Sequence, residues 1–378
     1  PRGLWPERDA ALTRELADSE KDRAENVMIV DMLRNDLGRI CETGSIRVKS
    51  LFDVERYETI WQMTSTISGR TRADVPEIFR ALFPSASVTG APKVRTMQII
   101  RELETGPRGV YCGSVGWWSP DRRAEFNVAI RTLTLEAETG CAVYPVGSGV
   151  TWDSSTEAEY DECIAKAVAV RRPRPEFELL ESLLFDGAYF LLEEHLDRLE
   201  ASAGYFGFRF DRDETRRALM DHVSGVDGGP RKVRLLLASS GRSTIQSELA
   251  PSPSPVQVRL ATKPVSTEDV FLYHKTTHRS AYDEALSGAE ACDDVILWNE
   301  CGELTESTRA NIVVELNGER LTPPIECGLL AGVMRRHLLE TGAIREEVLR
   351  VGVLQRATCV WLVNSVRCWV EAAVVTSE

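Results

Sequence analysis

The sequence reads KTTHR at residues 275–279 and LTESTRANI at residues 304–312. The first run offers the amine of Lys275, and the second offers the carboxylate of Glu306. An amine can hold the aldehyde of pyridoxal phosphate as a Schiff base, and a carboxylate can keep the pyridine nitrogen protonated so that the ring accepts electrons. The two runs therefore predict a pyridoxal phosphate site in the second half of the chain.

Length and composition predict two soluble domains. A chain of 378 residues exceeds one ordinary core, and the run RRPRP at residues 171–175 interrupts a helical pattern. We therefore expect domains at 1–170 and 177–378, joined by a linker at 171–176. The apolar fraction is 43%, and no window approaches the roughly 18 apolar residues of a membrane span, so we expect a cytoplasmic protein with no membrane partner.

Charge and cysteine content exclude other classes. A net charge of -13 without a basic stripe argues against a nucleic-acid partner. The nine cysteines are scattered without a C-x-x-C motif, which favours reduced thiols over disulfides or zinc. Because the chain begins at Pro1 rather than at Met, we expect it to be a fragment.

Hydrophobic periodicity predicts a mixed fold in both halves. Upstream we expect helices at 23–37, 78–83 and 93–103, and strands at 110–118 and 126–135. Downstream we expect a strand pair over 179–192 that turns at Asp186, a helix at 194–205, and strands at 233–237, 256–260, 295–298 and 312–316. The predicted fold class is a two-domain combination of α/β and α+β architecture.

Four stretches in the second half occur together in a recognisable order. They are HLDRL at 195–199, KTTHR at 275–279, Glu306, and LAGVMR at 330–335. In this order they resemble the class IV aminotransferase family, and most closely its aminodeoxychorismate lyases, over 177–375. Taken singly, each stretch has an ordinary structural explanation, since a lone lysine is most often a solvated surface residue.

The resemblance implies a class IV fold and a role for each stretch. Lys275 would bind the cofactor, Arg198 would grip its phosphate, and Glu306 would meet the pyridine nitrogen. The backbone at Gly332 and Val333, where a helix begins, would also hold the phosphate, which suits the unpaired N–H groups of a helix terminus. Either Asn364 or Ser365 would reach the phosphate, and the alignment leaves both open.

The implied chemistry is elimination from 4-amino-4-deoxychorismate. Lys275, once released from the cofactor, would take a proton from the carbon that bears the amine. Loss of the enolpyruvyl group would then give 4-aminobenzoate and pyruvate. A transaminase would use the same lysine, arginine and glutamate, so these motifs leave both reactions open.

The first half carries a second set of ordered motifs. They are KDRAEN at 21–26, TGAPK at 89–93, IRTL at 130–133, GSG at 147–149, and EAEYDE at 157–162. They resemble the chorismate-binding family, which includes aminodeoxychorismate synthase component I, anthranilate synthase and isochorismate synthase, and which folds as an anthranilate-synthase-like α/β sandwich.

That resemblance implies a magnesium site and a chorismate site. Glu25, Glu159 and Glu162 would surround Mg²⁺, which prefers a few hard oxygen ligands and shares its shell with an anionic substrate. The remaining substrate oxygens would be bound by Thr89, Arg131, Gly147, Ser148 and Gly149. Without the other motifs, a Glu159/Glu162 pair on a helix would more often be a solvated acidic face.

Two departures from the family pattern limit the expected synthase activity. Gln62 stands where some members have a catalytic histidine. In the family a P-I-K-G-T lysine lies just upstream of a P-R-G resembling residues 1–3, so we expect the chain to hold only the C-terminal third to half of this domain. Unpaired strands and exposed apolar surface would follow.

The leading hypothesis is therefore a fusion in folate-pathway 4-aminobenzoate synthesis, with part of a synthase component followed by a lyase. One alternative is a class IV amino-acid transaminase joined to an anthranilate-synthase-like domain. A third is that the first half is a non-catalytic docking remnant. By resemblance we also expect a glutamine amidotransferase subunit as a partner and a homodimer formed through the class IV domain.

Overall fold

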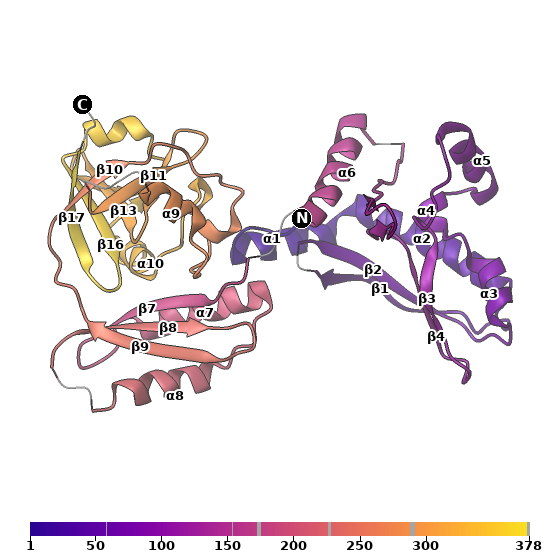
Figure 1. The fold of residues 1–378 in the computed structure, drawn as a ribbon, viewed down its shortest axis with the longest axis horizontal. Helices are drawn as coiled ribbons and strands as arrows, with labels where there is room; N and C mark the ends of the chain where they lie inside the picture. Colours follow the sequence, from indigo (N-terminus) through magenta and orange to yellow (C-terminus); the bar gives the residue numbers. More distant parts are fainter. Residues whose placement is uncertain (58, 153, 172–174, 226–227, 288–291, 376–378) are drawn as a thin grey trace. The chain divides into compact units, whose positions relative to one another are not determined.

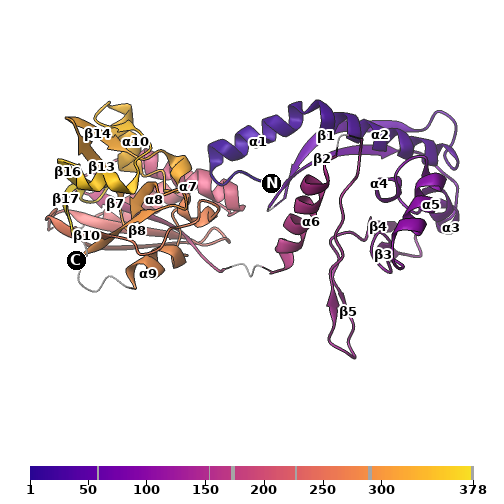
Figure 2. The ribbon, with the colours of Figure 1, turned by 90° about the horizontal axis from the view of Figure 1, so that it is seen from above.

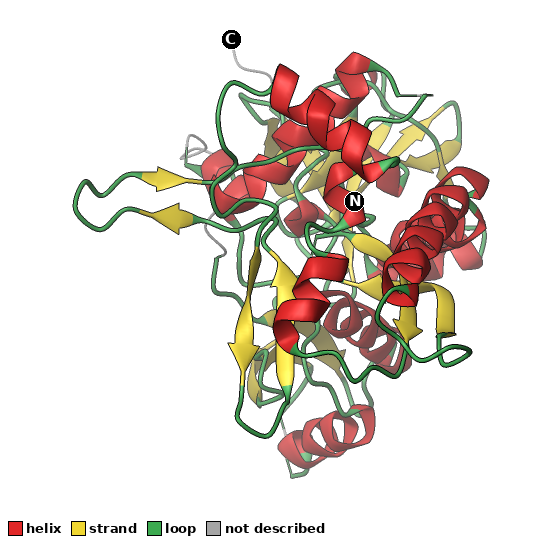
Figure 3. Ribbon diagram, turned by 90° about the vertical axis from the view of Figure 1, so that its right-hand side faces the viewer, coloured by secondary structure: helices red, strands yellow, loops and turns green. Residues whose placement is uncertain are grey.

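We describe a computed structural model of the chain, which covers all residues except 58, 153, 172–174, 226–227, 288–291 and 376–378. Helices and strands are mixed throughout (Figure 3), which confirms the predicted fold class. Two compact units form: the first comprises Pro1 and Thr13–Arg174, and the second comprises Arg2–Leu12 and Pro175–Glu378. Part of the predicted linker, 172–174, lies outside the described residues.

The first unit combines short sheets with helices. Its helices are α1 (Pro6–Asp18, whose first turns belong to the second unit), α2 (Glu20–Gly38), α3 (Val75–Leu82), α4 (Ala86–Thr89), α5 (Lys93–Leu103) and α6 (Thr156–Arg171). Three antiparallel pairs are formed by β1 (Arg47–Arg56) with β2 (Trp61–Ser68), β3 (Ser114–Trp118) with β4 (Ala124–Val128), and β5 (Thr134–Leu135) with β6 (Ala142–Val143). The three predicted helices are confirmed as α2, α3 and α5, and Figure 2 shows the hairpin of β5 extending away from the rest of this unit.

Large apolar side chains remain exposed in the first unit, as expected. Trp152 is 99% exposed, and Trp117 and Trp118 of β3 are 50% and 57% exposed. Every residue of β3 is exposed, so the β3–β4 hairpin buries little surface of its own. The predicted strand at 126–135 is wrong as a single element, because the chain leaves β4 through Arg131, whose φ of 50° is incompatible with an extended strand. The strand predicted at 110–118 is shorter in the structure. It begins at Ser114, as β3, because the positive φ of 61° at Cys112 interrupts the extended backbone.

The smaller layer of the second unit is an antiparallel sheet packed on two helices. Its strands β7 (Leu179–Phe185), β8 (Arg231–Leu237) and β9 (Ser243–Leu249) pair in sequence order. The helices α7 (Leu192–Phe206) and α8 (Arg212–Val223) cover the sheet (Figure 1) and bury leucines of both elements in one core cluster. The first strand of the pair predicted over 179–192 is confirmed as β7, but the second is wrong, because after the turn Tyr189 forms an isolated bridge to Phe185 and the chain then enters α7.

The larger layer is a sheet that closes on itself. Its strand order is β12-β11-β10-β17-β16-β13-β14-β15, and an additional β12–β13 pairing closes six of these strands into a ring. The strands are β10 (Val256–Leu260), β11 (Asp294–Trp298), β12 (Leu304–Ser307), β13 (Asn311–Leu316), β14 (Glu319–Thr322), β15 (Arg345–Glu346), β16 (Cys359–Asn364) and β17 (Cys368–Val374). The ring encloses an apolar core that includes Ile296, Leu304 and Ile312. Helices α9 (Ser280–Leu286) and α10 (Val333–Glu340) and three 3-10 turns, Val270–Leu272, Ile325–Cys327 and Val351–Gln355, complete this unit.

Residues near the amino terminus are built into the second unit. The Arg2 guanidinium lies 4.0 Å from the centre of the Tyr205 ring, and Trp5 stacks on Tyr273 with ring centres 5.1 Å apart. The His274 Nε2 atom is 3.1 Å from the Leu4 carbonyl oxygen, to which it must donate. Within the described ranges, no helix is both long enough and apolar enough to span a membrane.

Candidate active site

The segment that carries Lys275 is fixed to the edge of β7. Leu180 N–H donates to the Lys275 carbonyl at 2.9 Å, and Thr277 N–H donates to the Glu178 carbonyl at 2.9 Å. The Lys275 side chain is half-buried, and burial together with the positive charges of Arg198 and Arg279 lowers its pKa to about 8. A larger fraction of this amine is therefore neutral near pH 7 than in an ordinary lysine, as a nucleophile or base requires.

Glu306 is a buried carboxylate with three hydrogen-bond donors. It is 4% exposed, and its Oε1 atom accepts from the Tyr282 hydroxyl at 2.7 Å and from Leu330 N–H at 3.1 Å. Its Oε2 atom accepts from Asn311 Nδ2 at 3.1 Å. Burial raises the pKa of Glu306 to about 7, although the hydrogen bonds from Tyr282 and Leu330 oppose that shift.

The donors leave room for one more partner. An ionised carboxylate has about four acceptor positions, and three of those on Glu306 are used. The remaining position, on Oε2, fits the N–H of a pyridinium ring. The environment of Glu306 thus agrees with the role expected for it.

Asn311 joins Glu306 to the turn before α10. Its Nδ2 atom donates both to Glu306 and to the Leu330 carbonyl, at 2.8 Å, so the orientation of the amide is fixed by two acceptors. The Asn311 Oδ1 atom then lies under Gly332, where it would be 1.9 Å from a Cβ atom. Only glycine fits at this position, and the open backbone there leads directly into the first turn of α10.

Replacing Gly332 by alanine should therefore weaken cofactor binding. The added Cβ must displace Asn311, which disturbs both Glu306 and the entrance to α10. We expect at least about a tenfold loss of pyridoxal phosphate affinity, the equivalent of one hydrogen bond to a charged group, measured by fluorescence titration of the apoprotein. Gly352→Ala, on an exposed 3-10 turn of the same unit with open space around the Cβ position, is the control for a general effect of changing a glycine. Equal affinity of Gly332→Ala and the unsubstituted chain would contradict this assignment.

Arg198 is oriented by a buried carboxylate that the sequence motifs do not include. Arg198 Nε and Nη2 donate to Glu181 of β7 at 2.8 and 2.6 Å, while its Nη1 atom lies 3.3 Å from the Ala331 carbonyl oxygen. His195 Nδ1 lies 2.7 Å from the same carboxylate and must donate to it. Burial alone would raise the pKa of Glu181, but Arg198 and His195 outweigh that effect and lower it to about 2.

Three separate segments thus meet at residues 330–332. Arg198 of α7 contacts Ala331, Glu306 of β12 contacts Leu330, and Asn311 of β13 lies beneath Gly332. The first turn of α10 adds backbone N–H groups that have no intrahelical acceptor. A guanidinium beside a helix N-terminus is a suitable arrangement for a phosphate group.

Asn364 and Ser365 lie at the end of β16. The Asn364 Oδ1 atom accepts from the backbone N–H groups of Val366 and Arg367 at 3.0 and 2.9 Å, so its amide shapes the turn into β17. Its Nδ2 atom donates to the Arg309 carbonyl at 3.4 Å. Ser365 is 6% exposed.

In the first unit, the three predicted metal ligands gather around the GSG segment. Glu25 Oε1 lies 3.7 Å from the Cβ position of Gly149. Hydrogen bonds from Ser154 and Ser148 lower the pKa of Glu159. Glu162 instead forms an ion pair with Lys166, whose Nζ atom also donates to the Gly147 carbonyl at 2.9 Å.

The predicted magnesium site is not formed by these residues as they stand. Glu162 is paired with Lys166, and within the described part of the chain no three His, Cys, Asp or Glu side chains lie together so that they could hold a metal ion. A divalent cation would need Glu162 to turn away from Lys166.

The other predicted chorismate-binding residues lie on separate segments. Arg131 is exposed on the connection between β4 and β5. Thr89 ends α4, donates to the Ser85 carbonyl at 3.2 Å, and borders a hollow of about 500 Å³ with Arg108 and Tyr111. The side chain of Tyr111 reaches Gly147, since its hydroxyl oxygen is 2.6 Å from the Cβ position there.

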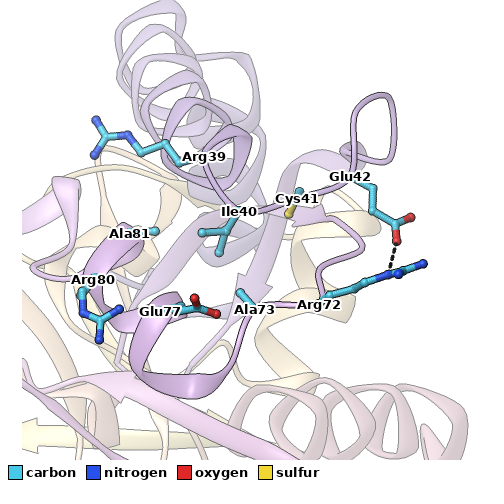
Figure 4. A pocket seen from close by; sticks show the side chains of 9 residues that line it. All are labelled: Arg39, Ile40, Cys41, Glu42, Arg72, Ala73, Glu77, Arg80 and Ala81. Atoms are coloured by element: carbon cyan, nitrogen blue, oxygen red, sulfur yellow. Dashed lines mark ion pairs between the residues drawn. The ribbon is translucent and has the colours of Figure 1, made fainter.

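A larger hollow in the first unit, of about 680 Å³, contains none of the predicted site residues (Figure 4). Arg72 pairs with Glu42 across its rim at 3.5 Å, and Glu77 belongs to the capping box of α3. Its side chains thus have structural roles, and we place no active site there.

Comparison with known proteins finds a family match for each half of the chain. Residues 177–375 match the amino-transferase class IV family, and the chain belongs to this family. Residues 1–172 match the family of chorismate binding enzymes. Both expected resemblances are confirmed, and membership of the class IV family implies pyridoxal phosphate as the cofactor.

Individual relatives cover only part of the chain. The aminodeoxychorismate synthase of Streptomyces pristinaespiralis is 49% identical over 169 residues, which is 44% of this chain and 23% of the relative. Aminodeoxychorismate synthase component 1 of Bacillus subtilis (strain 168) is 44% identical over 173 residues, 45% of this chain and 36% of the relative. A crystal structure of a Mesorhizobium loti protein assigned as an amino-acid aminotransferase has a TM-score of 0.51 and 31% identity, covering 53% of this chain and 100% of that one.

Three residues of the site were missed by sequence reasoning. Glu181 lies within the apolar run LLESLLF at 179–185, where a charged residue usually signals a buried hydrogen bond. Tyr282 stands between Ala281 and Asp283, so its surroundings in the sequence give no such signal. Asn311 lies inside the quoted run at 304–312 and pairs directly with Glu306 across the two strands. Its proximity in sequence could have identified it.

Proposed function

We propose that the second unit converts 4-amino-4-deoxychorismate to 4-aminobenzoate and pyruvate, and that the first unit is part of the synthase that supplies this substrate. The observation that supports the proposal best is the presence of both families in one chain. The first half is similar to aminodeoxychorismate synthases, and the second half has a site suited to pyridoxal phosphate. A lyase fused to such a synthase would consume its amine product.

The proposed reaction gives each site residue a task. The bound cofactor supplies an aldehyde for the substrate amine and a ring that accepts electrons. Lys275, with a pKa near 8, takes the proton from the carbon that bears the nitrogen. Glu306 holds a negative charge at the ring nitrogen, and Arg198 with the first turn of α10 holds the phosphate. Between the two candidates at the end of β16 we favour Ser365 as a further phosphate ligand, because the amide of Asn364 is used in its turn.

The decisive test is product analysis. The chain loaded with pyridoxal phosphate and supplied with 4-amino-4-deoxychorismate should release 4-aminobenzoate and pyruvate in equal amounts. Formation of an amino acid from an added oxo acid, without 4-aminobenzoate, would contradict the proposal.

An amino-acid transaminase is the second candidate. It is favoured by the similarity to the M. loti protein, which is assigned as an amino-acid aminotransferase. A transaminase returns the proton to the cofactor and needs a second substrate. Half-reactions with single amino acids, followed by the change in cofactor absorbance, distinguish it from the lyase.

For the first unit we propose chorismate as the ligand, a glutamine amidotransferase subunit as the ammonia source, and Mg²⁺ binding only when Glu162 leaves Lys166. Chorismate binding measured by calorimetry with and without Mg²⁺, in the unsubstituted chain and in Glu159→Ala, tests this. Metal-dependent binding that survives Glu159→Ala would point instead to the docking remnant.

The proposal also includes a homodimer formed through the second unit and a cytoplasmic location. Light scattering of the purified chain tests the homodimer.

A further inference from the structure

Tyr282 is a buried phenol that the proposed reaction does not use. It lies on α9, seven residues after Lys275, and is 6% exposed among Leu272, Val295 and other apolar side chains. Its hydroxyl donates to Glu306 Oε1 at 2.7 Å. A buried phenol commonly finds a partner, but here the partner is the carboxylate expected to face the cofactor ring.

Arg279 contacts the ring of the same phenol. Its guanidinium lies 4.4 Å from the centre of the Tyr282 ring, and its Nη2 atom donates to the Thr308 carbonyl. A cation over an aromatic face withdraws electron density, so the Tyr282 hydroxyl becomes a better donor. Arg279, Tyr282 and Glu306 thus form one connected row.

The hydrogen bonds determine where a proton can reside on Glu306. Oε1 has both acceptor positions filled, by Tyr282 and Leu330 N–H, whereas Oε2 has one position left beside Asn311. A proton shared between Glu306 and a pyridine nitrogen must therefore lie at Oε2. Hydrogen-bond donors to a carboxylate stabilise its ionised form. Donors to Glu306 therefore move the shared proton toward the pyridine nitrogen.

We infer that Tyr282 is a positioning residue that, through Glu306, keeps the proton on the pyridine nitrogen of bound pyridoxal phosphate. This inference rests on the cofactor binding proposed above. The charged and titratable groups that act on Glu306 are Lys275, Arg279 and Tyr282. Of these, Tyr282 alone donates a hydrogen bond to the carboxylate in the structure, and its own pKa is raised well above the usual value by burial and by the negative charge of Glu306, so it remains a donor.

The test uses pyridoxal phosphate labelled with ¹⁵N in the ring. In the unsubstituted chain the ¹⁵N resonance should lie at the position of a protonated pyridine. In Tyr282→Phe the carboxylate loses its shortest hydrogen bond, and the resonance should move toward the neutral-pyridine position. A change of one pKa unit in Glu306 would alter the ratio of the two protonation states about tenfold.

Tyr273→Phe is a matched control. Tyr273 belongs to the same core cluster and donates to a backbone oxygen, that of Thr267, at 2.8 Å. Loss of the Tyr273 hydroxyl should leave the ¹⁵N resonance unchanged, because that hydroxyl does not contact Glu306. The opposite change is to introduce 3-fluorotyrosine at position 282, which makes the phenol a stronger donor. The ¹⁵N resonance should then stay at the protonated position up to a higher pH. This experiment tests the same role of Tyr282 without removing a buried hydroxyl.

The outcomes separate this inference from the proposed function. Failure of the unsubstituted chain to bind the labelled cofactor would overturn the proposed function. Normal binding with the same ¹⁵N position in the unsubstituted chain and in Tyr282→Phe would overturn the role of Tyr282 alone. A similar shift in Tyr273→Phe would show a general packing effect and would also overturn it.

Discussion

Replacing Lys275 by alanine should lower the turnover of 4-amino-4-deoxychorismate by at least about 10²–10⁴-fold, the contribution of a positioned general acid or base. The same change should abolish the covalent attachment of pyridoxal phosphate, because the amine is lost. Burial and the neighbouring arginines lower the pKa of this lysine to about 8, which suits the proton transfer proposed for it. Stopped-flow assays of 4-aminobenzoate release and absorbance spectra of the loaded protein measure the two effects.

Two controls separate chemistry from folding in this experiment. Lys263→Ala removes an exposed lysine, 76% accessible and paired with Glu284 at 2.8 Å, and should leave turnover unchanged. Adding a small primary amine to Lys275→Ala should restore part of the activity if the lysine acts as a base. Full activity of Lys275→Ala without an added amine would show that another residue removes the proton.

Replacing Glu181 by glutamine should destabilise the second unit by about 3–5 kcal/mol, the usual cost of removing one partner from a buried ion pair. Glu181 is 2% exposed and binds both Arg198 and His195. Without its charge, the Arg198 guanidinium, whose side chain is 12% exposed, is left without its counter-ion. Hydrogen exchange of peptides from β7 and α7 measures the effect in this unit separately, because a chain of two units need not unfold in one step.

The stabilisation by Glu181 should also depend on pH. Its folded-state pKa, about 2, is below the ordinary value of 4.5, so its contribution is fully present above pH 4.5 and is lost as the pH falls toward 2. The shift corresponds to about 3 kcal/mol. Glu181→Gln should therefore flatten this part of the stability profile, whereas Glu248→Gln, in an exposed pair with Lys232, should change it little. An unchanged acid profile in Glu181→Gln would exclude this carboxylate as the source.

Much of the fold followed from local patterns. The helices α2, α3, α5 and α7 and the strand β10 appear close to where apolar spacing predicts them. Of the helices, α7 buries a regular face that includes Leu196, Leu199 and Ala203, whereas α5 buries none of its residues. The second strand predicted within 179–192 and the single strand predicted at 126–135 failed where a residue with positive φ, Leu191 or Arg131, ends an apolar run that is otherwise compatible with a strand. Side-chain periodicity does not encode such a turn.

The sequence by itself was enough to identify the class IV family and the match of the first half to chorismate binding enzymes, because the order of Arg198, Lys275, Glu306 and Gly332 depends only on the identity of residues along the chain. Only the tertiary structure decided what surrounds them. The β12–β13 pairing puts Asn311 against both Glu306 and Gly332, packing of α7 on β7 brings Glu181 to Arg198, and α9 delivers Tyr282 to Glu306. These contacts depend on strand register and helix packing between distant segments, which set the distances on which hydrogen bonds and pKa values depend.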